Sequence, residues 1–371
     1  MERLLKILGY VLLWGLIIVA TYLLYVGGRE RRDTLEVSDV VVNIVDSTAS
    51  GNLITRSMIE QILSRERIEL VGTKVNSVPL TQIEEIVSRN GFVSNAVAYV
   101  DYSGVLNIDI RQRVGVVRIL LDGYNCYITK VGFVFGAPST TAINTPVVTG
   151  SYKPLFEAGY IGHIEERKRE LIAEIDLLIE RVEKEKYPIY LRERENAENR
   201  RKLRRSYINQ RIFEPDRDFD DRVERLREKN RLNRERYAKI QRAIDSELNL
   251  LEQRQEHYRE EQKKIEKKCE DIYNLITFVG IVESDPFWRS EIVQIELQRG
   301  ERDDMRLRMA VRSGNFIVTL GSMSCEEGSK SSINEKLSRL RDFYDEALPR
   351  VGWDRYREIN IEYKNQVICK R

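Results

Sequence analysis

The stretch TQIEEIVSRNGFVSNAVAYVDYSGVLNIDIRQ (81–112) carries one helix signal and two strand signals in a row. Thr81 stands three positions before Glu84, which is the spacing of a capping box at the start of a helix. Asn90-Gly91 then supplies a helix stop, and two β-rich runs flank a Ser103-Gly104 turn. In the second run, three apolar residues alternate with polar ones, namely Leu106, Ile108 and Ile110. Such alternation predicts a strand with one buried and one wet face, so the stretch predicts a helix followed by a β-hairpin.

The residues before this stretch add one strand and a second helix. VVVNIV (40–45) is a β-branched run that predicts a strand, and Ser57 with Glu60 repeats the capping-box spacing. The predicted order over residues 37–115 is therefore strand-helix-helix-strand-strand. This order resembles that of a POTRA domain, a module that offers sheet edges and helix grooves to partners and is not catalytic.

Residues 7–28, ILGYVLLWGLIIVATYLLYVGG, contain no charged side chain. About 20 apolar residues at about 1.5 Å each span about 30 Å, the thickness of the hydrocarbon layer of a bilayer. A cleaved signal peptide is the alternative, but its apolar region is shorter and ends at a small-residue cleavage site, which this stretch does not offer. We therefore expect a retained single transmembrane helix at 7–28 after a short tail at 1–6. Cations flank both ends of the helix, so the positive-inside rule does not decide its orientation.

The composition excludes several classes of function. The 371 residues include 61 Lys+Arg and 59 Asp+Glu, and a net charge of +2 argues against a nucleic-acid binder that depends on excess cations. The four cysteines form no CxxC pair, and both histidines, His163 and His257, are assigned to a highly charged arm. The sequence has no GxSxG, P-loop, HExxH or GxGxxG motif. We therefore predict a non-enzymatic protein without a metal or cofactor.

Residues 161–270 form a segment of unusual charge, with 30 Lys+Arg and 27 Asp+Glu. We expect helices broken at Pro188 and Pro215, because a proline inside a helix removes a hydrogen bond. From Val223 to Ile272 one heptad position stays largely apolar, while the companion position becomes charged. A seam of this kind fits an antiparallel hairpin better than a long symmetric dimer. Three roles stay open: a solvated arm without a dedicated partner, an arm that reaches a separate partner, and a dimer seam.

Mixed α/β composition lies on both sides of this segment, at 116–160 and 271–371, and we interpret the two parts as one domain. Within the second part we expect a helix at 272–287, an amphipathic helix at 333–348, and final strands at 356–363 and 366–370. The predicted fold class is α+β: a single transmembrane helix, a POTRA domain, and a mixed β domain interrupted by a long helical or coiled-coil insertion.

Four pieces of the sequence resemble one known family. VGWDRYREINIEYKNQVICKR (351–371), after the helix LSRLRDFYDEALPR (337–350), is similar to the end of the Bacteroidota-type cell-division family FtsQ/DivIB. VVRILLDGYNCYITKVGFVFGAPSTTAINTPVVTGSYKPLF (116–156) resembles the start of that family's β domain, and DIYNLITFVGIVESDPFWRSEIVQIEL (271–297) resembles its continuation. The charged insertion departs from the family pattern, and the resemblance makes another division protein or the cell wall the separate partner that such an arm could reach.

The resemblance implies a scaffold of the division machinery in the inner membrane, at the septum, with a cytoplasmic amino-terminal tail and a periplasmic bulk. Such proteins hold FtsB and FtsL and help to regulate septal wall synthesis by FtsW and FtsI. In relatives the last strand of the β domain receives a strand from FtsB, which is β-augmentation. Carried onto this sequence, the contact residues are Ile359, Ile361, Tyr363, Val367 and Ile368. The first three alternate with polar residues, which predicts that they share one side of a strand. Ile361 fits the domain core equally well, and the alternative function is a POTRA-bearing envelope assembly or translocation factor.

Cys126 and Cys369 fall in predicted strands of the same β domain. In an oxidising periplasm they could form a disulfide or remain two buried free thiols. The sequence leaves both alternatives open, because the distance between the two residues cannot be read from it.

Overall fold

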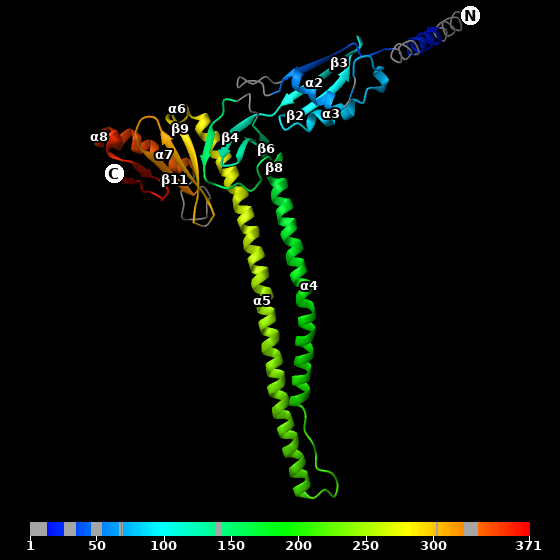
Figure 1. Cartoon of the computed structure of the whole chain (residues 1–371), viewed down its shortest axis with the longest axis vertical. Helices are drawn as coiled ribbons and strands as arrows, with labels where there is room; N and C mark the ends of the chain where they lie inside the picture. Colours follow the sequence, from blue (N-terminus) through cyan, green and yellow to red (C-terminus); the bar gives the residue numbers. More distant parts are fainter. Residues whose placement is uncertain are drawn as a thin grey trace, which may run out of the picture. The chain divides into compact units, whose positions relative to one another are not determined.

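The computed structural model describes residues 13–25, 35–45, 54–66, 68, 70–137, 143–301, 303–322 and 333–371. The chain divides into two compact units, whose segments can be followed by colour in Figure 1. The first unit contains Met1–Ile164, Ile272–Gly300 and Met305–Arg371. The second contains Glu165–Asp271 and Glu301–Asp304. The first unit is therefore assembled from segments that are far apart in the sequence.

Part of the predicted membrane anchor is helical. Residues 13–25 form a helix in which Leu16, Ile18 and Leu24 are exposed. Within the part of the chain that the structure describes, no helix is both long enough and apolar enough to cross a bilayer. The tail at 1–6 and both ends of the predicted anchor lie outside the described residues, so the single-pass anchor stays a prediction.

A three-stranded sheet with the order β1-β3-β2 lies in the first unit. β1 (Asp39–Ile44) pairs parallel with β3 (Val105–Gln112), and β2 (Val93–Val100) pairs antiparallel with β3. Helices α2 (Arg56–Arg65) and α3 (Leu80–Ser88) come between β1 and β2 in sequence, and their buried residues join the same core. The predicted order strand-helix-helix-strand-strand is confirmed.

The buried face of β3 lies in the core of this small domain. Leu106, Ile108 and Ile110 are each 0% exposed, which confirms the prediction from their alternation. Burying each of them contributes roughly 2 kcal/mol. The β2–β3 turn needs a glycine, because Gly104 has a φ of +88° and a Cβ there would lie 2.7 Å from the carbonyl oxygen of Glu36.

Both helices of this domain begin at residues other than the predicted caps, so the two capping boxes are wrong. The hydroxyl of Thr55, two residues before the predicted cap of the first helix, accepts a hydrogen bond from the Met58 N–H at 3.4 Å. α3 begins directly after Pro79. Glu84 does not reach back to the helix start, because its carboxylate accepts a hydrogen bond from the Ala98 N–H of β2 at 2.8 Å. The local sequence pattern contained no sign that the neighbouring strand β2 would bind the Glu84 side chain.

A mixed ten-stranded sheet forms the larger part of the first unit, with the order β13-β12-β11-β10-β9-β7-β4-β5-β6-β8. The strands before the insertion are β4 (Gly115–Leu121), β5 (Tyr124–Thr129), β6 (Phe133–Gly136), β7 (Val147–Gly150) and β8 (Gly162–His163). The strands after it are β9 (Ile292–Arg299), β10 (Met305–Val311), β11 (Ile317–Ser322), β12 (Glu358–Asn360) and β13 (Ile368–Lys370). β7 joins the two groups, because it pairs parallel with β4 on one side and with β9 on the other.

An interrupted helix carries the aromatic centre of this domain. The segments are α7 (Ile333–Asp342), a π-helical turn (Phe343–Ala347) and α8 (Leu348–Val351). Tyr344, in the π-helical turn, is surrounded by four aromatic rings, those of Phe287, Trp288, Phe316 and Trp353. The ring centroids lie between 5.3 and 6.1 Å from that of Tyr344, in edge-to-face arrangements that favour aromatic pairs. Phe287 and Trp288 come from α6 (Pro286–Glu291).

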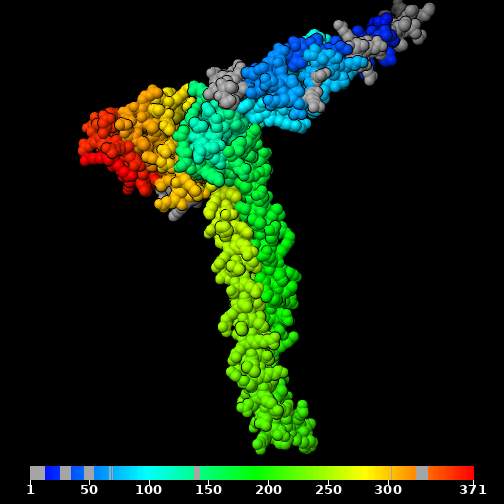
Figure 2. Space-filling model, in the orientation of Figure 1, coloured from blue at the N-terminus to red at the C-terminus, as the bar shows by residue number. Residues whose placement is uncertain are grey.

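The second unit is a helical hairpin, and Figure 2 shows its two helices in contact along the visible face. α4 (Ile164–Arg204) and α5 (Asp216–Ser284) run antiparallel. Pairs across the hairpin show this direction: Glu185–Arg254 at 3.1 Å, Arg192–Glu247, and Asn196–Gln241 at 2.9 Å. An apolar seam lies between the helices and consists of Val182, Ile189, Ile244 and Leu251. The heptad position noted in the sequence thus faces α4.

Two helix boundaries predicted for this region are wrong. Pro188 does not break a helix but lies inside α4, where it forfeits one backbone hydrogen bond. The neighbouring Ile189 is buried in the seam against α5, and this packing outweighs the local cost. No helix begins at Ile272, because α5 continues unbroken to Ser284. Pro215 does precede a helix start, a place where a missing N–H costs little.

Candidate functional site

The last two strands form one margin of the ten-stranded sheet. β12 pairs parallel with β11, from Ile317↔Glu358 to Thr319↔Asn360, and antiparallel with β13. β13 has β12 on one side, and among the residues that the structure describes no strand lies on its other side. A marginal strand presents backbone N–H and C=O groups that a further strand can pair with. The open edge is therefore that of β13 and not that of β12.

The loop between β12 and β13 is held by helix α7. Asn365 has a φ of 58°, in the left-handed region that asparagine tolerates better than most residues. The guanidinium of Arg339 in α7 donates hydrogen bonds to the carbonyl oxygen of Tyr363 and, at 3.3 Å, to that of Gln366. Both strands have only three residues and are shorter than predicted, because residues 361–367 form this loop.

The five predicted contact residues separate into two groups. Ile359 and Ile361 are 0% exposed, so their side chains belong to the domain core. Tyr363 is 52% exposed, Ile368 is 41% exposed and Val367 is half-buried. A strand added to β13 could therefore touch only the side chains of the second group. The sequence pattern missed this division, because it carried the alternation of Ile359 and Ile361 on to Tyr363, past the end of the strand.

Ion pairs fix the side chains of this margin. The carboxylate of Glu358 accepts hydrogen bonds from the Lys370 ammonium and the Thr319 hydroxyl, each at 2.9 Å. These two hydrogen bonds, first that of Lys370, hold the pKa of Glu358 below its ordinary value. In the loop, the guanidinium of Arg306 donates to the largely buried carboxylate of Glu362. These hydrogen bonds and ion pairs connect β10, β11, β12 and β13 at the exposed edge of the sheet.

Cys126 and Cys369 do not form the disulfide that the sequence left open, since both thiols are free. Their strands, β5 and β13, lie seven strand spacings apart in the sheet. At about 4.8 Å per spacing this separates them by about 30 Å, whereas a disulfide needs Cα atoms within about 7 Å. Burial raises the pKa of the Cys126 thiol to about 12, so almost none of it is thiolate at neutral pH.

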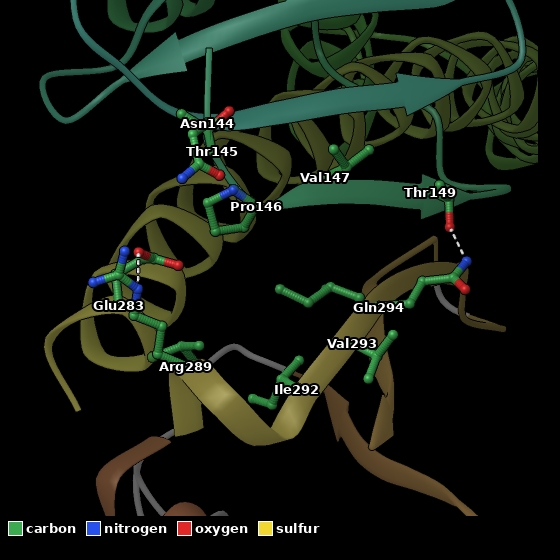
Figure 3. A pocket seen from close by; sticks show the side chains of 12 residues that line it. Asn144, Thr145, Pro146, Val147, Thr149, Glu283, Arg289, Ile292, Val293 and Gln294 are labelled. Atoms are coloured by element: carbon green, nitrogen blue, oxygen red, sulfur yellow. Dashed lines mark hydrogen bonds and ion pairs between the residues drawn. The ribbon is translucent and has the colours of Figure 1, made fainter. Parts of the chain in front are cut away.

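A second candidate surface is a notch inside the sheet, where β7 and β9 diverge (Figure 3). Pairing of these strands begins at Val148↔Ile295, and the residues before them line a cavity of about 560 Å³. Pro146 contributes to the gap, because it has no N–H for β9 and its carbonyl oxygen accepts a hydrogen bond from the Arg118 N–H at 2.9 Å. A register shift between β9 and β10 near Val293 accompanies the 64% exposure of that side chain.

The notch offers shape and polarity but no reactive group among its lining residues. Its two charged side chains, Glu283 and Arg289, pair with each other at 3.5 Å and are exposed. At the other end, the amide of Gln294 donates to the hydroxyl of Thr149 at 2.8 Å (Figure 3). Such a surface can take up a peptide or a side chain, but it holds no pair of groups set for acid–base chemistry. Pro146 was the one signal of this notch in the sequence, because a proline cannot donate a hydrogen bond to a neighbouring strand.

Neither His163 nor His257 belongs to a cluster of metal-ligating side chains among the described residues. Within the described ranges, no group of three or more His, Cys, Asp and Glu side chains could hold a metal ion. His163 lies in strand β8 rather than in the charged arm, and its ring packs edge-on against Phe133 at 5.0 Å. His257 lies on α5, 3.6 Å from the carboxylate of Glu261.

Two family models match parts of the chain. A model described as FtsQ/DivIB, C-terminal related, matches residues 243–370, which include the second half of α5 and strands β9 to β13. A model described as a POTRA-like domain matches residues 36–111, which include nearly all of the three-stranded sheet. A search of curated proteins finds no match. The open edge of β13 lies inside the first of these matched ranges.

Proposed function

Because this chain is an FtsQ/DivIB-type protein with a POTRA-like domain, we propose that it acts as a non-enzymatic scaffold of the bacterial division machinery. The helix at 7–28 would anchor it in the inner membrane, with a cytoplasmic tail and a periplasmic bulk at the septum. Its β domain would recruit FtsB and FtsL, and through them help to regulate septal wall synthesis by FtsW and FtsI.

One observation carries this proposal, namely the open edge of β13 together with accessible side chains in this strand and in the loop that leads to it. Ile368 begins β13 and is exposed, Val367 directly precedes it and is half-buried, and the exposed Tyr363 lies in the loop between β12 and β13. A strand that pairs with β13 would complete the sheet and cover these side chains. This is strand addition, in which main-chain hydrogen bonds give affinity and alternate side chains give selectivity.

The length of β13 limits what the main chain alone can contribute. A three-residue strand offers about two outward hydrogen-bonding positions, each with a net contribution of about 1 kcal/mol. Micromolar binding requires about 8 kcal/mol, so most of the affinity must come from side chains. Tyr363 is the strongest candidate, because aromatic residues supply much of the binding energy of protein interfaces.

Site-specific photocrosslinking tests this assignment on the full chain in nanodiscs with purified FtsB–FtsL complex. A benzophenone amino acid in place of Val367 should crosslink to FtsB. The matched control is the same probe in place of Val97, an exposed residue of β2 (45% exposed), which should give no crosslink to FtsB. A crosslink from the control position alone would refute strand addition at β13.

The alternative is an envelope assembly or translocation factor, which the POTRA-like domain also favours. A functional fluorescent fusion separates the two functions. A division scaffold concentrates at mid-cell in dividing cells, whereas an assembly factor spreads evenly along the envelope.

A further inference from the structure

The outer part of the helical hairpin carries two patches of opposite charge. Residues 200–205 and 225–236 contain eleven Lys or Arg and two Glu, a net charge of +9. We call these residues the basic band. Residues 214–224 contain six Asp or Glu and two Arg, a net charge of −4, and we call them the acidic end. The whole chain has a net charge of only +2, so the two patches are a local separation of charge.

The two segments of the basic band lie side by side. The amide of Asn230 on α5 donates to the hydroxyl of Ser206, just beyond α4, at 2.9 Å. Further along, the amide of Asn196 donates to the carbonyl oxygen of Tyr237 at 3.2 Å. The last turns of α4 are thereby placed beside the stretch of α5 that begins near Asn230, and their cations are exposed together.

Exposed apolar side chains accompany both patches. Ile212 and Phe213, directly before the acidic end, are 87% and 101% exposed. Tyr207, two residues after the first segment of the basic band, and Leu232, within the second segment, are 79% and 53% exposed. A hairpin without a partner gains nothing from presenting four such side chains to water.

Hydrogen bonds hold the loop that carries Phe213 in a defined conformation. The carboxylate of Glu214 accepts hydrogen bonds from the Arg211 N–H at 2.8 Å and from the Arg222 guanidinium, and these bonds hold its pKa below the ordinary value. Gln210 donates to the carbonyl oxygen of Glu214 at 3.1 Å. Phe213 itself has a φ of 65°, a strained conformation for a bulky residue that the surrounding bonds must maintain.

We propose that two copies of this chain associate through the outer ends of their hairpins, in antiparallel overlap. The acidic end of each copy lies on the basic band of the other, and a two-fold axis relates the two contacts. The patch centres, near residues 219 and 231, are about 18 Å apart along α5. The two patches together cover residues 214–236 of the hairpin, so the overlap is about 30 Å long. In this register Phe213 of one copy lies close to the basic band of the other, where Leu232 and the neighbouring Tyr207 are exposed.

A second copy fits these observations better than a polyanion does. An anionic polymer or lipid surface would be attracted by the basic band but repelled by the acidic end beside it. An identical chain satisfies both patches at once, because a two-fold interface pairs each patch with its complement twice. Opposite patches of this kind determine which partner is selected and speed association, and their effect falls with salt.

Complementary charge reversal tests the proposal on the full chain in detergent by sedimentation velocity. The end variant carries three substitutions of exposed acidic residues: Asp218→Lys, Asp220→Lys and Asp221→Lys. The band variant carries three substitutions of exposed cations: Arg201→Glu, Lys202→Glu and Arg205→Glu. Each variant alone should dimerise at least tenfold more weakly than the wild type at low salt. An equimolar mixture of the two should recover the wild-type dimer, since every reversed patch then meets its complement.

The rescue in the mixture separates an interface from simple misfolding, because two misfolded hairpins would not restore each other. Circular dichroism on each variant should show unchanged helix content. The proposal is overturned if the wild type is monomeric at low salt at every concentration measured, or if the mixture associates no better than its components. It is equally overturned if the wild type stays monomeric while its basic band binds phosphatidylglycerol vesicles.

Discussion

Replacement of Tyr363 by alanine should weaken capture of FtsB while leaving the domain folded. A tyrosine side chain has about 200 Å² of surface, and at 52% exposure about 100 Å² of it remains for a partner to cover. At about 25 cal/mol per Å², this area corresponds to about 2.5 kcal/mol, part of which is offset by ordering the side chain. We therefore expect a loss of about 2 kcal/mol, or roughly a 30-fold rise in the Kd. The stability of the domain should change by only about 0.5 kcal/mol.

Ile359→Ala is the matched control variant and should show the opposite pattern of effects on stability and on the Kd, because this side chain is 0% exposed and belongs to the core. It should lower the free energy of unfolding by about 3 kcal/mol and leave the Kd of the folded protein nearly unchanged. Titration of FtsB–FtsL against the full chain in nanodiscs gives the Kd, and urea denaturation gives the stability. Tyr102→Ala, which removes a fully exposed tyrosine of the POTRA-like domain, controls for the loss of an aromatic residue. An unchanged Kd for Tyr363→Ala would refute the reasoning.

Four further outcomes are expected. Lys336→Met should destabilise the β domain by about 2 kcal/mol in urea denaturation, because the buried ammonium donates to two carbonyl oxygens at the end of β11, and an unchanged midpoint would contradict this. Cys126, whose pKa burial raises to about 12, should resist iodoacetamide at pH 7.5 in the native state and react more slowly than the partly exposed Cys369; equal labelling of these two would be the contrary result. The pKa of Glu358 is lowered in the folded state, so its carboxylate stabilises the fold fully at pH values above the pKa of about 4.3 in the unfolded chain. This stabilisation is lost as the pH falls through the lower pKa of the folded state, and Glu358→Gln should remove this part of the loss of stability in acid. Pro188→Ala should raise the thermal midpoint of the hairpin, by restoring one helix hydrogen bond with a gain of up to about 3 kcal/mol, and a lower midpoint would show that α4 needs its proline.

Much of the small amino-terminal domain followed from its sequence, because its signals are local. The alternation of Leu106, Ile108 and Ile110 fixed which face of β3 is buried, and the structure confirms it. The exact helix caps did not follow. Several polar residues stand close together at each helix start, and only the packed strand shows that Glu84 bonds to β2.

The order of strands in the larger sheet could not be read from the sequence, since pairing between distant strands has no local signal. For that reason the distance between Cys126 and Cys369 stayed open until the sheet order excluded a bond. The same holds for Pro188, whose local cost is outweighed by burial of the adjacent seam against α5. Packing with a partner helix is a non-local property.

The candidate edge was predicted in its place but not in its details. The alternation rule placed Ile359, Ile361 and Tyr363 on one side, and it holds only while the chain stays extended. β12 ends at Asn360, and the loop held by Arg339 turns Tyr363 outward while Ile361 stays buried. Arg339, the residue of α7 that holds this loop, lies 24 residues before Tyr363, and nothing in the sequence indicated that the two would be in contact.

The aromatic centre around Tyr344 gives the β domain an optical signature of its own. The chain has three tryptophans: Trp288 and Trp353 are in this centre, and Trp14 is in the amino-terminal helix. Neither the POTRA-like domain nor the hairpin contains one. Excitation of indole at about 295 nm therefore follows melting of the sheet that carries the open edge of β13, largely without a contribution from the hairpin. A Trp14→Phe substitution would make the emission specific to that one domain.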